Sequence, residues 1–407
     1  MKYCKRIVEE TIKCKLTDES IVNIVGPREC GKTTVALRFA KSSLPLDEKF
    51  ESLEKLSEFK PQLLLEGEKP LLIDDIERIP VLNESIITAS KRIHNNGLFI
   101  TTNSLSSENL VEMHPLSLYE SGESSGEIKV LDLFENPDLN IDGVESRLEL
   151  EELIDATSRG GFPRAFESES EMKGYIDRVI GDYIPEVCGF RRNPDKVKAI
   201  LRVYADNIYT PVKNSEILKQ VQLECPTIAK STYYKYLRDL RALRVVDEIP
   251  SWGHMIKAPT SVRTASRKGF CDPSIPISLL NLNHWDLLFD LAKFEYFFKN
   301  LCYRDLKVYT SLCGGKIGYY ADRYCCVIDC ILQIENGDYA LINFDLSGSR
   351  LDNSIKKLLR ISRFIERKIN SGVLSIRKPK FLAIITASQT AYTHKDGVLI
   401  LPVSVLK

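Results

Sequence analysis

The stretch GPRECGKTTVALRFA, residues 26–40, decides the fold of the first part of the chain. Its first eight residues fit the pattern G-x-x-x-x-G-K-[ST], and they follow a short apolar run, SIVNIVG, at residues 20–26. The glycines allow a tight turn, so that backbone N–H groups point inward at the start of a helix and can hold phosphate oxygens. The sequence therefore predicts a strand, a phosphate-binding loop and a helix over about residues 32–42.

Two side chains of this loop carry the predicted chemistry. Lys32 is placed to reach the β- and γ-phosphates of a nucleoside triphosphate, and the Thr33 hydroxyl is placed to bind Mg²⁺. Lys32 is thus a candidate catalytic residue, and ATP with Mg²⁺ is the predicted ligand. The residues expected to surround the phosphates are Gly26, Pro27, Arg28, Glu29, Cys30, Gly31, Lys32, Thr33 and Thr34.

A second motif supplies carboxylates. The run LLIDD at residues 71–75 is typical of a buried strand that ends in two acids. Asp74 is expected to hold Mg²⁺, mostly through water, and Asp75 is placed to polarise the attacking water as a catalytic residue. Two acids after a strand also mark many helix starts, but their position after a phosphate-binding loop favours the functional interpretation.

A third strand is predicted at residues 98–104, LFITTNS. A polar side chain at its end would lie between the two phosphate motifs and could orient the water. Asn103 is the first candidate for this catalytic role, and Thr102 and Ser104 are the alternatives. An ordinary turn at the strand end is the competing interpretation.

These strands alternate with helical segments, one of them at about residues 83–94, and EIKVLDLF at residues 127–134 is a candidate fourth strand. The alternation predicts an α/β fold with a sheet that is parallel at least in part. Beyond about residue 145, helical periodicity dominates as far as residue 243. From about residue 287 the pattern mixes again and predicts a second α/β unit.

Composition limits the classes of function. The 407 residues suffice for two to four domains, and 56 basic residues balance 56 acidic ones, so any nucleic-acid surface must be a local patch. No apolar run has the roughly 18–20 residues that would span a bilayer, and the N-terminus lacks the apolar core of a signal peptide. We therefore expect a cytoplasmic protein that does not contact a membrane. Its 11 scattered cysteines are expected to be reduced and without metal.

Six stretches together resemble a known family. In chain order they are GPRECGKTT, LLIDDIERIP, HPLSLYE, GGFPRAF, STYYKYLRDLRALRVVDEIP and FCDPSI. The chain resembles prokaryotic AAA-type P-loop ATPases that carry a C-terminal domain of uncharacterised function. The resemblance implies an AAA-type ATPase domain over residues 1–150, a helical and winged-helix region over 151–285, and a small α/β domain similar to restriction endonucleases over 286–407.

Three departures from the family pattern concern hydrolysis. The family usually has Glu where this chain has the shorter Asp75, and Gly where it has Asn103. The family also usually has an arginine before the PLS motif, whereas residues 105–114 contain none. A carboxylate displaced by about 1 Å can cost a hundredfold in rate. Two hypotheses follow: a slow or partner-stimulated ATPase, whose arginine could come from a neighbouring copy, and a nucleotide-dependent binding switch with negligible hydrolysis.

The segment NSEILKQVQLECPTIAKSTYYKYLRDLRALRVV predicts two helices and a strand, as in a winged helix. On its second helix, residues 233, 237 and 240 are expected to pack inward, and the opposite side would enter the major groove of duplex DNA. The alternative, to which we give equal weight, is that this domain contacts other proteins instead of DNA. The residues proposed to touch nucleic acid are Thr232, Lys235 and Arg238 on the helix, and Arg263, Arg267 and Lys268 on a wing.

The C-terminal unit has a degenerate nuclease pattern. Asp329 stands at the expected first carboxylate, and Glu295 could be an extra acid. Asn343 and Asp345, however, stand where the second acid and the lysine of a (D/E)-x-K motif belong, so nuclease activity is improbable. A structural or docking role is favoured. A basic helix near residues 353–369 is interpreted as a solvated face, with a surface for nucleic-acid backbone as the alternative.

Overall fold

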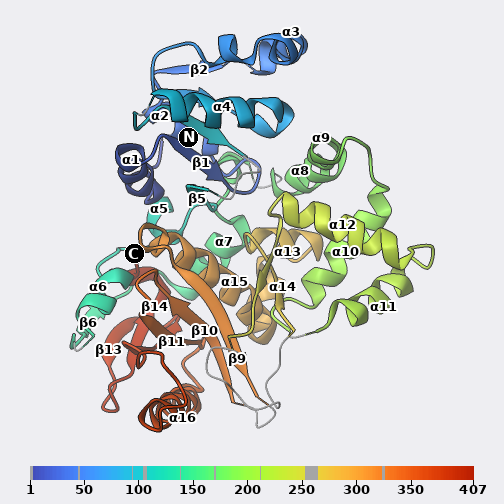
Figure 1. Cartoon of the computed structure of the whole chain (residues 1–407). Helices are drawn as coiled ribbons and strands as arrows, with labels where there is room; N and C mark the ends of the chain where they lie inside the picture. Colours follow the sequence, from blue (N-terminus) through green and yellow to red (C-terminus); the bar gives the residue numbers. More distant parts are fainter. Residues whose placement is uncertain are drawn as a thin grey trace.

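The structure is a computed structural model that describes residues 3–44, 46–93, 95–103, 108–137, 139–168, 171–210, 212–252, 265–322 and 326–407. Figure 1 shows one sheet with its helices at the N-terminal end, a group of helices beside it, and a second sheet formed mainly by the C-terminal part of the chain. No helix in these ranges is long and apolar enough to cross a membrane.

The first sheet has five parallel strands in the order β2-β3-β4-β1-β5. This confirms the predicted strands in the first 104 residues and their parallel pairing. The predicted helix after the phosphate-binding loop ends at Phe39, because the edge strand β2 begins at Ser42. The strands are β1 Ile21–Val25, β2 Ser42–Leu44, β3 Leu71–Ile73, β4 Phe99–Thr102 and β5 Leu110–Glu112, and the helices are α1 Val8–Asp18, α2 Lys32–Phe39, α3 Leu46–Phe59 and α4 Val81–Ile93.

The predicted fourth strand at residues 127–134 is wrong. Ile128 forms a single bridge to Leu406, and the chain then turns into the helix α6, Val130–Glu135. Buried apolar residues at 130, 133 and 134 follow the spacing of a helix, which packing against the C-terminal unit stabilises. Helix α6 therefore packs with the C-terminal unit, and β6, Asp142–Glu145, joins the second sheet as an edge strand that pairs with β13.

The middle of the chain is helical and ends in a hairpin. On α12 the side chains of Tyr233, Leu237 and Leu240 are buried, as the spacing predicted. The hairpin strands β7 Val246–Ile249 and β8 Arg267–Phe270 are antiparallel. The helices are α5 Leu118–Ser121, α7 Leu150–Arg159, α8 Glu171–Arg178, α9 Ile184–Cys188, α10 Pro194–Asp206, α11 Asn214–Glu224, α12 Lys230–Ala242 and α13 Ser274–Leu279.

The second sheet is mixed, with seven strands in the order β6-β13-β14-β12-β11-β10-β9. Helix α16 packs its apolar face on β10, β11 and β12. The strands after β8 are β9 Lys316–Ala321, β10 Val327–Gln333, β11 Tyr339–Phe344, β12 Leu382–Thr386, β13 Thr390–Thr393 and β14 Leu399–Pro402, and the helices are α14 His284–Phe289, α15 Leu291–Tyr309 and α16 Leu351–Asn370.

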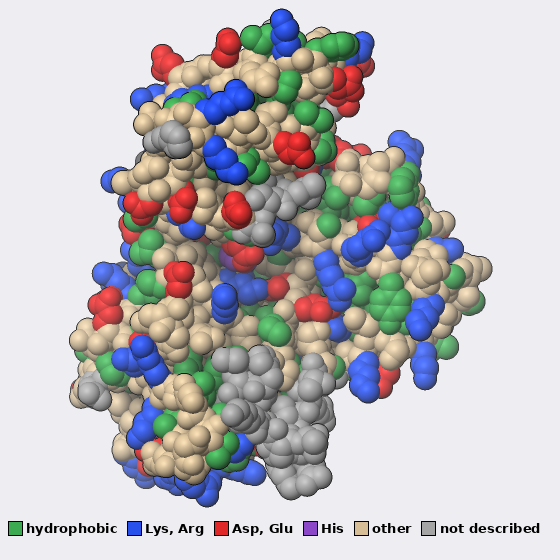
Figure 2. All heavy atoms as spheres, viewed as in Figure 1, with side chains coloured by type: hydrophobic (Ala, Val, Ile, Leu, Met, Phe, Trp, Pro, Cys, Tyr) green, Lys and Arg blue, Asp and Glu red, His purple; other side chains and the backbone are tan. Residues whose placement is uncertain are grey.

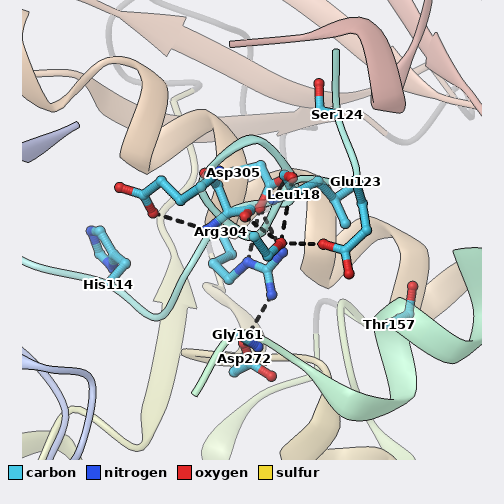
Figure 3. A network of polar contacts seen from close by, with 12 residues as sticks. His114, Leu118, Glu123, Ser124, Thr157, Gly161, Asp272, Arg304 and Asp305 are labelled. Carbon is cyan, nitrogen blue, oxygen red and sulfur yellow. Dashed lines mark hydrogen bonds and ion pairs between the residues drawn. The ribbon is translucent and has the colours of Figure 1, made fainter. Parts of the chain in front are cut away.

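A buried guanidinium joins the three parts of the chain (Figure 3). Arg304 on α15 is 4% exposed and forms ion pairs with Asp272 at 3.0 Å and with Asp305 at 2.7 Å. Asp305 accepts a hydrogen bond from the Leu118 backbone N–H, and Asp272 accepts one from that of Gly161. The motifs HPLSLYE, GGFPRAF and FCDPSI therefore meet at one cluster of charges, which we call the Arg304 cluster.

We expect Arg304→Met to destabilise the protein by about 3–5 kcal/mol, because it leaves two buried carboxylates without a cation. Urea unfolding followed by circular dichroism would measure the loss. Lys198→Met is the control, since Lys198 pairs with Asp177 on the surface, where such pairs contribute about 0–1 kcal/mol. Equal losses for the two variants would contradict a special role of the Arg304 cluster.

Candidate nucleotide-binding site

A cavity of about 440 Å³ lies beside the phosphate-binding loop. This volume is within the usual range for small-molecule sites. Residues 28, 29 and 31–35 of the loop and the start of its helix line the cavity, together with Asp75. The remaining lining comes from the N-terminal segment, the HPLSLYE motif, and the GGFPRAF motif with the residue after it: Tyr3, Cys4, Arg6, Leu116, Pro163, Arg164 and Glu167.

The loop backbone has the geometry that its glycines predict. Gly31 has a φ of +101° immediately before α2, where a side chain would be strained. A Cβ at Gly26 would lie 2.2 Å from the backbone oxygen of Met113, so the strand-to-loop turn also requires glycine. Lys32 is 6% exposed, and its ammonium donates to the carbonyls of Gly26 (3.2 Å) and Pro27 (2.8 Å). The loop thus closes around the predicted phosphate-binding lysine.

The two residues predicted to hold Mg²⁺ lie together. The Thr33 hydroxyl donates to Asp74 Oδ2 at 2.8 Å, and the Thr102 hydroxyl donates to Asp74 Oδ1 at 2.5 Å. A hydroxyl and a carboxylate are hard oxygen donors, which suit Mg²⁺ bound together with phosphate oxygens and water. The described residues contain no group of three or more His, Cys, Asp or Glu that could hold a metal by itself. Two protein oxygens leave most positions around Mg²⁺ open to phosphate oxygens and water, so the pair fits an ion that arrives with a nucleotide.

Both oxygens of the Asp75 carboxylate are engaged. Arg28 Nη1 lies 2.5 Å from Oδ2, and Asn103 Nδ2 donates to Oδ1 at 2.6 Å. Asp75 and Asn103 have φ values of +46° and +54°, in the left-handed region. Asparagine tolerates that region better than most residues, which explains how it replaces the glycine of the family pattern. Ser104, an alternative to Asn103, lies outside the described residues.

Arg28 connects the loop to two other segments. Its Nη2 lies 2.7 Å from a Glu77 oxygen and 3.1 Å from a Glu186 oxygen on α9. Burial opposes the charge of the guanidinium, but the carboxylates of Asp75 and Glu77 outweigh this effect, so the pKa of Arg28 is raised. A cation inside the predicted phosphate loop is therefore held by three carboxylates, an arrangement that the loop pattern gave no reason to expect.

Glu29 extends from the loop in another direction. Its carboxylate accepts two hydrogen bonds from Arg178 on α8, at 2.7 and 2.9 Å, and one from the Tyr183 hydroxyl. Burial alone would raise the pKa of Glu29, but these hydrogen bonds outweigh it and lower the pKa. Arg164 lies 3.6 Å from the same carboxylate and lines the cavity with 59% of its side chain exposed. It is a cation at the cavity that sequence reasoning missed, although the GGFPRAF motif contains it.

The residues predicted to touch nucleic acid fall into two groups. On α12, Lys235 and Arg238 are exposed and Thr232 is partly exposed. Arg263 lies outside the described residues. The prediction that Arg267 and Lys268 line a wing against phosphates is wrong, because they are only 5% and 2% exposed. Their strand β8 packs inside the protein, where the carboxylates of Asp329 (2.9 Å) and Glu248 (3.2 Å) pair with them respectively.

The residues of the degenerate nuclease pattern also lie together. Asp329 pairs with Arg267 and with Lys299, the latter at 3.3 Å. Burial would raise the pKa of Asp329, but Lys299 and Arg267 outweigh it and lower the pKa to about 2. Asn343 Oδ1 accepts a hydrogen bond from the Asp329 backbone N–H. Glu295 forms ion pairs with Lys299 and Arg350. Asp345 accepts a hydrogen bond from the Arg350 backbone N–H. Two cations therefore occupy the surroundings of Asp329, where a nuclease would hold its metal.

Residues 18–120 match the family model described as AAA domain, and residues 150–286 match that of a domain of unknown function (DUF8612). The first match spans the phosphate-binding loop and all five strands of the first sheet, so this part of the chain has the sequence pattern and the fold of an AAA-type P-loop domain. No curated protein matches the chain.

Two solved structures are distantly similar. The Walker-type ATPase PABY2304 of Pyrococcus abyssi is 12% identical, with 67% of this chain and 94% of that one covered and a TM-score of 0.40. AMPPCP-bound DnaA from Aquifex aeolicus is 12% identical, with coverages of 58% and 86% and a TM-score of 0.22. Both TM-scores lie below 0.5, so neither likeness supports an inference about this chain.

The low pKa of Asp329 predicts a pH-dependent contribution to stability. Its folded value of about 2 lies below the ordinary 3.8, so the ion pairs stabilise the protein above about pH 4 and lose their effect as the pH falls toward 2. We expect Asp329→Asn to lower the free energy of unfolding by about 2–3 kcal/mol at neutral pH. Urea unfolding as a function of pH should show this difference shrinking below about pH 4. A difference in unfolding free energy between wild type and Asp329→Asn that does not change with pH would contradict the role of the ion pairs. Asp352→Asn, at an exposed site, is the control.

Proposed function

We propose that the chain binds ATP with Mg²⁺ at the P-loop and hydrolyses it slowly. The observation that carries this proposal is the hydrogen bond from Thr33 to Asp74, next to Lys32 in a loop that lines the cavity and closes on the Lys32 ammonium. These three residues come from two separate motifs, and their contacts match the roles that each motif predicts. The match of residues 18–120 to an AAA domain supports the same activity.

Each residue has a defined role under this proposal. The ammonium of Lys32 exchanges the carbonyls of Gly26 and Pro27 for phosphate oxygens. Thr33 and Asp74 hold Mg²⁺, which supplies positive charge for the phosphoryl group when it is bound. Asp75 polarises the attacking water, and Asn103 orients the Asp75 carboxylate through its side-chain amide. Arg164, which lines the cavity beside Glu29 of the loop, supplies a cation in the place of the arginine that residues 105–114 lack.

Slow turnover follows from the contacts of Asp75. A carboxylate whose two oxygens accept hydrogen bonds from Arg28 and Asn103 is a poor acceptor for a proton from water. Arg28 has to leave Asp75 before water can take its place, and Glu186 on α9 holds Arg28 from the other side. Movement of the helical region therefore offers a way to release Asp75, which fits a partner-stimulated ATPase.

Lys32→Ala should reduce phosphate release to background, because the γ-phosphate loses the cation that stabilises its developing charge. A coupled assay of phosphate release with purified protein and Mg²⁺ measures this. Lys60→Ala, an exposed lysine in the same domain, should hydrolyse ATP like the wild type. Unchanged turnover in Lys32→Ala would disprove the assignment of the site.

Arg28→Gln should raise basal turnover at least about fivefold, because a charged hydrogen bond of about 1 kcal/mol or more no longer restrains Asp75. The same assay measures turnover, and titration with a fluorescent ATP analogue measures nucleotide affinity separately. Arg38→Gln, on the exposed side of α2, is the matched control. Lower turnover at unchanged affinity would show that Arg28 assists hydrolysis instead of restraining it.

The alternative is a nucleotide-dependent binding switch with negligible hydrolysis, and the engaged Asp75 favours it as well. Its partner would be duplex DNA or a protein that contacts α12 through Lys235 and Arg238. Turnover titrated with duplex DNA at low and high salt separates the two functions. Stimulation that weakens with salt supports a DNA-stimulated ATPase. Nucleotide-dependent DNA or protein binding without turnover supports the switch.

A further inference from the structure

Helix α16 carries a row of cations along its outer face. Lys356, Arg360, Arg363 and Arg367 are all exposed, and their spacing of three or four residues places them on one side of the helix. The row extends about 16 Å along the helix axis. Figure 2 shows Lys and Arg side chains gathered at the lower end of the molecule, where Figure 1 places α16. We call these four residues the α16 basic row.

The acids that lie near this row in the sequence and are described in the structure do not form ion pairs with it. No ion pair joins any of its four residues to an acid within the described parts of the chain. Glu366, the acid next to the row, pairs with Lys378, and Asp352 lies one turn beyond its N-terminal end. The row is therefore a concentrated positive charge on a chain whose basic and acidic residues are equal in number.

The composition of the row identifies the chemistry of a partner. Three of the four cations are arginines, whose planar guanidinium groups match phosphate oxygens in pairs. The row offers no large apolar anchor of the kind that protein interfaces use. Phe364, beside the row, is partly buried and covered by the Lys368 ammonium at 4.8 Å, so it provides no free ring on which single-stranded bases could stack.

A membrane surface is a poorer partner for the same helix. An amphipathic helix binds a bilayer by burying its apolar face in it. The apolar face of α16 is already packed on the second sheet through Ile355, Leu358, Ile361 and Ile365. We propose that the α16 basic row binds the phosphate backbone of duplex DNA without reading its sequence. This surface is separate from α12, and its binding of DNA does not depend on bound ATP.

The test uses the full chain without ATP and a short labelled DNA duplex of mixed sequence, with binding followed by fluorescence polarisation at several salt concentrations. Four phosphate contacts contribute about −3.6 to the slope of log affinity against log salt, which is about a 150-fold loss from 50 to 200 mM. When the four residues are replaced by glutamine (K356Q, R360Q, R363Q and R367Q), we expect the slope of log affinity against log salt to become shallower by about 3.6.

Two control proteins separate local contacts from general charge and from folding defects. Replacing four exposed cations elsewhere (K13Q, K60Q, K91Q and R92Q) makes the same change in net charge and should leave the slope within about 1 of the wild type. Arginine-to-lysine changes at 360, 363 and 367 keep the charge and should keep the slope. The proposal is overturned by absent duplex binding, by tighter binding of the single strand, by a wild-type slope in the glutamine variant, or by loss of the slope in the lysine variant.

Discussion

The fold depends on the pairing of one buried guanidinium with two carboxylates. A charge such as that of Arg304 cannot remain in the interior without partners, so α15, the segment after β8 and the start of α5 have to meet at one point. The same meeting fixes the GGFPRAF segment, because the Gly161 carbonyl also accepts a hydrogen bond from the Leu116 backbone N–H at 2.7 Å. Pro163 and Arg164 follow directly and form a wall of the cavity. The proposed nucleotide site is thus built from distant segments that a cluster outside the site holds together.

The phosphate-binding loop is itself attached to the helical region through two positions that its sequence pattern leaves free. Arg28 and Glu29 extend to α9 and α8, so the loop cannot change its charge contacts without affecting those helices. Under the proposed function, a bound triphosphate brings negative charge close to Arg28 and competes with Asp75 for it. Electrostatics alone then couples the occupancy of the site to the helices that match a domain of unknown function.

The sequence was sufficient for the parts of this structure that rest on local rules. The strands β1, β3 and β4 follow from apolar runs, and the meeting of Thr33 with Asp74 follows from a motif whose chemistry fixes its geometry, whereas the edge strands β2 and β5 were not predicted. Residues 127–134 were predicted wrongly, because a short apolar run fits a strand or a buried helix, and contact with the C-terminal residues decided between them. The engagement of Asp75 by Arg28 could not be predicted, since the side chains that hold Arg28 come from separate elements.

The basic residues show most clearly what local sequence patterns cannot predict, namely which contacts the fold brings to a side chain. Arg267 and Lys268 looked like contacts for phosphate, yet each has a carboxylate of the fold beside it, and no local pattern in a strand of four residues reveals that partner. On α16 the spacing of the residues alone predicts that the cations lie opposite the apolar face. Over twenty residues, the apolar positions recur at helical spacing and so mark the side that is buried. A group of basic residues is thus evidence for an anionic partner only after the carboxylates of the fold have been accounted for. By that criterion the α16 basic row keeps its charge available to a partner, while the strand β8 does not.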